Sequence, residues 1–183
     1  MKIILRNSDL YLLKSLLSKN NEVGGILPVI DIYHDTILLS YDPSMTTTGT
    51  PSNLTMELPD TAAYIFHTHP IHAYLKSRSN KGWLSGVDIE FILSNPQVKV
   101  HFIISLEGVY AIRPLQRDLS PDDASRVVDA VTKLEKFREY GRAYQFSALI
   151  NHLNTLKSNN SRIMEITLHS WHQPACVFEF KGV

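Results

Sequence analysis

The stretch AAYIFHTHP, residues 62–70, joins a continuous apolar run to two histidines and a proline. Such a run predicts a strand at the centre of a sheet, buried on both faces. Strand side chains alternate between faces, so His67 and His69 are expected to project from one face, close enough to share an ion. Pro70 has no backbone N–H with which to continue the pairing. We therefore predict a central strand that ends at its histidines.

A carboxylate is expected to join these two imidazoles. The segment SGVDIEFILSN, residues 85–95, predicts a helix with Ser85 at the N-cap, so that Asp88 in its first turn can point back toward the histidine strand. Two imidazoles and one carboxylate form a three-ligand zinc set with a fourth position for water, whose pKa zinc lowers to about 7. Each pattern alone also has a plain structural explanation, as polar strand residues or as an ordinary capping box.

A hydrolase of this kind also needs a general base, and the helix motif H-E-x-x-H is absent. Glu22 precedes the apolar segment VGGIL, in which Gly24 and Gly25 are expected to allow close backbone approach. A single glutamate before a strand is usually solvated. Here Glu22 is expected at the mouth of a buried strand.

These residues resemble the JAMM (MPN-plus) metalloprotease family, whose pattern is a Glu before a glycine-containing apolar strand, then H-[ST]-H-P, then S-x-x-D. The chain has Glu22, His67-Thr68-His69-Pro70 and Ser85-Gly86-Val87-Asp88 in that order, within residues 8–113. The resemblance implies that His67, His69 and Asp88 hold one Zn²⁺ per chain with a catalytic water. Glu22 would then carry a proton from that water to the leaving amine, and Ser85 would stabilise the oxyanion.

The resemblance also implies a fold and a function. The fold would be α/β, a mixed β-sheet sandwiched between helices, with the MPN/JAMM-type, cytidine-deaminase-like layered architecture. The function would be that of a zinc metallo-isopeptidase that hydrolyses amide bonds after the C-terminal tail of ubiquitin or a ubiquitin-like protein. The alternatives are a JAMM-type peptidase that processes another polypeptide, such as a phage or bacterial tail protein or a sulfur-carrier protein, an inactive MPN scaffold subunit, and the DNA-repair-associated branch. The complete ligand set argues against the scaffold, and the balanced charge against the DNA-repair branch.

The segment between Pro70 and Ser85 is longer than the family pattern usually has. It spans residues 71–84 and carries three basic residues, Lys76, Arg78 and Lys81. These side chains would bind acidic surface on the substrate if the segment is a flap over the site. The alternative is a passive surface insertion.

Other histidines and the single cysteine receive simpler interpretations. His72 as a fourth ligand would close the zinc site and make it structural. His101 is expected to be a core or edge histidine, and no role is predicted for His169 or His172. Cys176 is expected to be a small buried hydrophobic residue, and it permits no disulfide within the chain.

Composition excludes some classes of protein. The 183 residues are 44% hydrophobic and 20% charged, with 18 basic and 18 acidic residues, so a globular protein without the charge of a general nucleic-acid binder is expected. No apolar run is long enough to span a membrane, and the first residues lack a signal-peptide pattern. We expect a cytoplasmic, reducing location, and no nucleic-acid or membrane partner.

One MPN/JAMM-like domain is expected over residues 1–183, with the motif-bearing core in 1–115. Residues 116–183 should pack on that core, bind a partner or mediate self-association. The expected strands are 22–34 with its hairpin partner 35–42, 98–105, 108–114, 162–171 and 175–181. The expected helices are one capped by Ser8 and Asp9, one that begins after Ser120, and one over 142–156 after a break at Gly141, while 43–53 is expected to be a loop.

Overall fold

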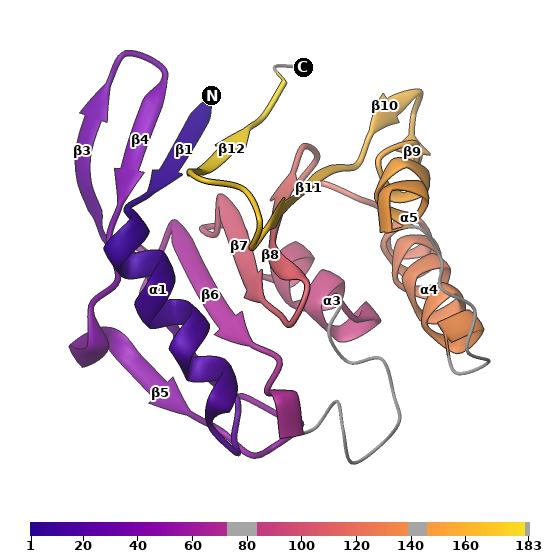
Figure 1. Cartoon of the computed structure of the whole chain (residues 1–183). Coiled ribbons are helices and arrows are strands. Elements are labelled where there is room, and N and C mark those ends of the chain that lie inside the picture. The colour runs from indigo at the N-terminus through magenta and orange to yellow at the C-terminus, as the bar shows by residue number, and fades with distance from the viewer. Residues whose placement is uncertain (73–83, 139–145, 182–183) are drawn as a thin grey trace.

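The computed structural model describes residues 1–72, 84–138 and 146–181. The chain is a mixed α/β structure in which sheets are flanked by helices, so the expected fold class is confirmed at this level (Figure 1). Lys76, Arg78 and Lys81, and the break expected at Gly141, lie outside the described residues.

A six-stranded sheet carries the histidine strand. Its order is β11-β8-β7-β6-β2-β5, in which β6 runs parallel to β7 and antiparallel to β2. All five residues of β6 are buried, which confirms the prediction of a central strand. The bounds are β2 Val23–Ile26, β5 Thr46–Thr48, β6 Tyr64–Thr68, β7 Val100–Ile104, β8 Gly108–Pro114 and β11 Met164–Ser170.

Helices cover one face of this sheet, and a second sheet with one helix covers the other (Figure 1). Ile65 packs on the first side among residues of α3 (Gly86–Ser94), α4 (Pro121–Arg138) and α5 (Phe146–Leu153). Phe66, the next residue, packs on the opposite side with residues of α1 (Asn7–Ser15) and of the second sheet. The alternation of strand side chains thus divides the apolar run between two cores.

The second sheet has four strands in the order β12-β1-β4-β3. Its bounds are β1 Lys2–Leu5, β3 Val29–Tyr33, β4 Thr36–Leu39 and β12 Cys176–Glu179. Because β12 pairs with β1, the two ends of the chain lie near each other (Figure 1). The shorter elements are the 3₁₀ turns Leu16–Ser18 and Pro43–Met45, and the paired strands β9 (Lys157–Ser158) and β10 (Ser161–Arg162).

The expectation of one strand over residues 22–34 is wrong. The segment divides into β2 and β3, which belong to different sheets. Pairing with β6 continues as far as the Leu27 N–H, which donates to the Tyr64 carbonyl at 2.8 Å. Pro28 then follows with no N–H to donate, so the chain leaves the first sheet there. The expected pairing of 29–34 with the next segment is confirmed as β3 against β4.

Two smaller expectations also need correction, and one short strand was not predicted. Residues 43–53 are not all loop, because Thr46–Thr48 form β5, where β-branched residues suit an edge strand. The first helix begins at Asn7 with Arg6 at the N-cap position and no side-chain cap, because Asp9 instead accepts a hydrogen bond from Arg6 Nε at 2.9 Å. The strand at Lys2–Leu5 was not predicted, since four residues are too few to show a period.

Predictions for the second half of the chain agree better with the structure. The hairpin β7–β8, the strands β11 and β12, and the helix that begins after Ser120 are all present. β11 and β12 are built into the two sheets by pairing with β8 and β1. The assignment of residues 1–183 to a single domain stays a prediction. Among the helices that the structure describes, none has the length and apolar character that crossing a membrane requires.

Candidate metal centre

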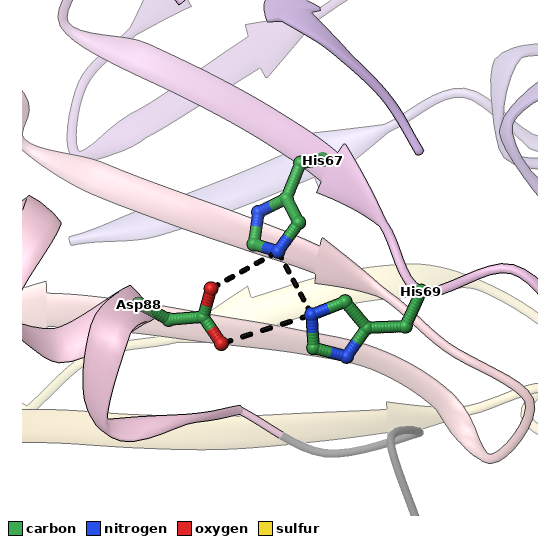
Figure 2. Close-up of side chains that lie close together, drawn as sticks. All are labelled: His67, His69 and Asp88. Carbon is green, nitrogen blue, oxygen red and sulfur yellow. Dashed lines mark hydrogen bonds and ion pairs between the residues drawn. The ribbon is translucent and has the colours of Figure 1, made fainter. Parts of the chain in front are cut away.

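Three side chains from two elements point toward one another (Figure 2). His67 Nε2 lies 2.9 Å from His69 Nε2 and 3.1 Å from Asp88 Oδ1. His69 Nε2 lies 3.7 Å from Asp88 Oδ2. Their three side chains are only 7%, 10% and 10% exposed, in the order His67, His69 and Asp88. The structure therefore brings together the three predicted ligands.

The histidines are placed by the pairing of β6 with its neighbours. His67 is the fourth residue of β6 and lies between Gly24 of β2 and Ile103 of β7 in the register of the sheet. His69 follows the strand, and its N–H donates to the carbonyl of Ile104 at 2.9 Å. That hydrogen bond keeps His69 in an extended geometry, and the two rings therefore remain on one face.

Asp88 is held by the N-terminal capping box of α3. Ser85 Oγ accepts from the Asp88 N–H at 3.2 Å, and Asp88 Oδ2 accepts from the Ser85 N–H at 2.5 Å. The same carboxylate presents Oδ1 to His67, so the helix cap orients the predicted ligand. A Cβ at Gly86 would lie 2.4 Å from Thr132 Oγ1 of α4. A larger residue at position 86 would therefore force Thr132 to shift where α4 packs on the beginning of α3.

The donor set fits a zinc ion. Ligand atoms placed about 2.0–2.2 Å from a tetrahedral zinc lie roughly 3.3–3.5 Å from one another, close to the separations observed here. Two imidazole nitrogens and one carboxylate oxygen are ligands that zinc accepts in catalytic sites. The buried group is therefore able to hold a metal ion, and zinc is compatible with it.

The electrostatics of the site also favour a cation. Burial by itself lowers the pKa of His67, but the Asp88 carboxylate and the charge of Glu22 outweigh it and raise that pKa. Burial by itself raises the pKa of Asp88, but His67 and the neighbouring imidazoles hold it well below its usual range. The field that draws a proton onto His67 also attracts a metal cation, which then competes with that proton.

Glu22 lies on the same face of the sheet as the ligands. Gly24 is opposite His67 in the antiparallel pair β2–β6, and this register, continued by two residues, places Glu22 opposite His69. Glu22 is half-buried, and its charge contributes to the raised pKa of His67. The expected close approach at the two glycines is confirmed, since a Cβ on Gly24 would lie 2.3 Å from Leu54 Cδ2 and one on Gly25 2.2 Å from the Met45 carbonyl.

His101 belongs to the site, although the sequence suggested only a core or edge histidine. It is 2% exposed on β7, as a core histidine would be, but its Nε2 lies 2.8 Å from His67 Nδ1. Burial, together with the charge of His67, lowers the pKa of His101 to about 3 and keeps its ring neutral. The signal in the sequence was a single imidazole in the apolar segment VKVHFIIS, which follows the histidine strand by one helix.

The remaining histidines and the cysteine lie apart from this group. His72 and His172 are exposed, and His72 is not one of the converging ligands. His169 is buried against Phe178 on the other face of the sheet. Cys176 is buried as predicted, and burial raises the pKa of its thiol to about 12.

Comparison with models of known families found no match, and no curated protein matched the sequence. What the site can do chemically is therefore inferred from the arrangement of its side chains. The imidazoles of His67 and His69 converge with the Asp88 carboxylate, which the Ser85 cap holds, and the charge of Glu22 acts on His67. Such an arrangement can hold a divalent cation and has a further carboxylate that is able to accept a proton.

Proposed function

We propose that this protein is a zinc-dependent peptidase or isopeptidase of the JAMM (MPN-plus) type, with the layered MPN/JAMM architecture. The observation that carries the proposal is the convergence of His67, His69 and Asp88, whose ligand atoms all lie within 4.8 Å of one another. Two histidines and one carboxylate leave a position open for a water or a substrate oxygen, as a catalytic rather than a closed site requires. Zinc bound there would acidify water and polarise a carbonyl.

Glu22 is the proposed general base. Extension of the β2–β6 register by two residues puts Glu22 opposite His69, and the charge of Glu22 acts on His67, which supports this role. Backbone hydrogen bonds of 2.9 Å to Gly49 and Thr50 join Glu22 to the sheet. A carboxylate held there can accept a proton from water and deliver it to the departing amine. Its half-buried position next to an imidazole supports that role.

Ser85 is the proposed oxyanion donor. Its Oγ accepts the Asp88 N–H in the helix cap, which uses one of the two acceptor positions of a hydroxyl. The hydroxyl proton is a separate donor, so capping and oxyanion stabilisation are compatible in one side chain. Ser85 would thus both hold the Asp88 carboxylate in place and donate a hydrogen bond to the substrate carbonyl.

The proposed substrates are conjugates or precursors of ubiquitin or a ubiquitin-like protein, cut after the extended C-terminal tail. Such a tail can add as a strand to the edge of a sheet. β5 is the edge strand of the six-stranded sheet, and residues 49–50 just after it pair with Glu22. An edge therefore lies beside the proposed base. A cytoplasmic location, where such conjugates occur, is part of the proposal.

A cleavage panel tests the function. Purified protein is incubated with ubiquitin chains, ubiquitin-like precursors and an unrelated peptide mixture, with zinc or with a chelator, and Glu22→Gln is run beside the parent. We expect zinc-dependent cleavage of a ubiquitin-like substrate that Glu22→Gln lacks. Zinc-dependent cleavage of only the unrelated peptides would favour a processing peptidase. Tight zinc binding without any cleavage would favour a scaffold.

A further inference from the structure

We propose that His101 is a positioning residue of the metal centre, which accepts a hydrogen bond from the Nδ1–H of His67 and thereby directs the Nε2 lone pair of His67 toward Asp88 and His69. This inference rests on the proposed metal centre, although not on any particular substrate. His101 would not touch the metal, and it would act only through His67.

The contact joins two buried residues on adjacent parallel strands. His67 Nδ1 and His101 Nε2 are 2.8 Å apart, and their ring centroids are 4.8 Å apart. The register pairs His67 with Ile103 and His101 with Ile65, so the two histidines are diagonal neighbours on one face of the sheet. They are 5% and 2% exposed, respectively. Such a short contact between buried rings requires one nitrogen to carry a proton and the other a lone pair.

The role of His67 decides which nitrogen carries the proton. A neutral imidazole has one N–H and one lone pair, and a metal ligand must offer the lone pair. Because Nε2 is the atom that faces His69 and Asp88, the proton of a metal-binding His67 lies on Nδ1. His101 Nε2 must then accept that hydrogen bond. The reverse direction would place the His67 proton on Nε2 and block the ligand atom.

The surroundings of His101 indicate that packing alone does not explain a histidine at this buried position. Its strand neighbours Val100, Phe102 and Ile103 are apolar and fully buried. Its Nδ1 is buried and has no hydrogen-bond partner among the described residues. An apolar side chain would avoid the cost of this unsatisfied nitrogen. A neutral acceptor also orients His67 without adding a third negative charge beside Asp88 and Glu22.

Metal affinity of variants tests the inference. The variants are His101→Phe, which removes the acceptor, His101→Gln, whose side-chain oxygen can replace it, and the control His169→Phe, which replaces another buried strand histidine on the opposite face. Zn²⁺ affinity is measured by competition with a chromophoric chelator. Loss of a residue that orients a metal-binding histidine typically weakens binding about 10–100-fold. We expect that loss for His101→Phe, a smaller one for His101→Gln, and none for His169→Phe.

A second measurement does not depend on a variant that folds. Nitrogen-15 NMR of the histidine rings in the zinc-loaded parent should show His67 protonated at Nδ1 and His101 unprotonated at Nε2. A protonated His101 Nε2, or zinc binding by His101→Phe as tight as that of the parent, would overturn the inference alone. A parent that binds no zinc would overturn the metal centre and the inference together. Zinc binding without peptide cleavage would overturn only the proposed peptidase activity.

Discussion

The backbone N–H of Val23 donates a hydrogen bond of 2.9 Å to Oγ1 of Thr68, between two buried residues 45 positions apart. Thr68 lies between the proposed ligands His67 and His69, and Val23 follows Glu22. The hydroxyl therefore connects β6, which carries His67, to β2, which begins next to the proposed base Glu22. We expect it to hold Glu22 in place relative to the proposed metal centre.

Thr68→Val should lower turnover while zinc content stays unchanged. The variant leaves the buried Val23 N–H without its acceptor, which costs about 1–3 kcal/mol of folding free energy. Displacement of Glu22 by about 1 Å can lower turnover by about 100-fold. Thr68→Ser, which retains the hydroxyl, should recover most of both losses. Thr167→Val is the control, because Thr167 Oγ1 has no hydrogen-bond partner among the described residues. Equal turnover in Thr68→Val and the parent would contradict this role.

Zinc content should depend on His69 and Asp88 but not on His72. The parent should bind one zinc per chain, and His69→Ala and Asp88→Asn should each lose most of it, because each removes one of three ligands. His72→Ala is the matched control, since His72 is exposed and outside the converging group. Elemental analysis after dialysis measures the bound metal. Equal zinc in His69→Ala and the parent would exclude the site as described.

Glu22→Gln should separate catalysis from metal binding. The amide keeps the size of the side chain but cannot act as a base, so turnover should fall by about 10²–10⁴-fold while zinc content and the melting temperature stay near those of the parent. The control is Glu57→Gln, because Glu57 is an exposed glutamate. Loss of zinc together with activity would show that Glu22 is instead a ligand or a structural residue.

Ser85→Ala should lose both stability and rate. The cap contributes about 1 kcal/mol to folding, and loss of an oxyanion donor lowers turnover by about 10²–10³-fold. Ser120→Ala removes a comparable cap, in which Ser120 Oγ accepts from the Asp123 N–H at 3.1 Å at the start of α4. Ser120→Ala should therefore lose similar stability and retain turnover. A similar loss of turnover in both variants would assign Ser85 a purely structural role.

The metal-free protein should lose stability in acid because of its buried neutral histidines. Burial lowers the pKa of His169, and burial with the charge of His67 lowers the pKa of His101 to about 3, against an ordinary value near 6.5. Below about pH 6.5 the unfolded chain therefore binds protons that the folded chain excludes, and the free energy of unfolding falls as pH falls toward 3. Each such proton lowers the free energy of unfolding by up to about 1.4 kcal/mol for each unit by which the pH falls.

Substitution of either histidine should flatten this acid dependence. Denaturant unfolding of the parent and of His101→Phe is measured with a chelator present between pH 7 and pH 4. The slope should be shallower in His101→Phe, and His169→Phe should change it in the same direction. His67 has the opposite sign. Because its pKa is raised, the stability that it contributes is complete below pH 6.5, so the slopes are compared below that pH, where His67 adds none. An unchanged slope in His101→Phe would show that His101 is not buried in its neutral form.

Local patterns in the sequence determined much of the site. Alternation along residues 62–70 placed His67 and His69 on one face, and the helix start at Ser85 placed Asp88 in a first turn, because both properties depend only on neighbouring residues. The pair Gly24-Gly25 likewise predicted that neighbouring segments approach the backbone closely at these two residues. The same local logic failed at residues 22–34, where one apolar segment serves two sheets.

Other features depend on contacts between distant segments, which no local pattern records. The pairing of β6 with β7 brings His101 to His67, and the pairing of β2 with β6 brings Glu22 close enough for its charge to act on His67. The close packing of α3 on α4 at Gly86 is another such contact. The sequence by itself determined which residues could be ligands, since ligand chemistry and strand period are local. Only the tertiary structure decided that a third imidazole, that of His101, contacts His67 and that the charge of Glu22 acts on the same ring, because strand order and register are set by the burial of the whole apolar surface.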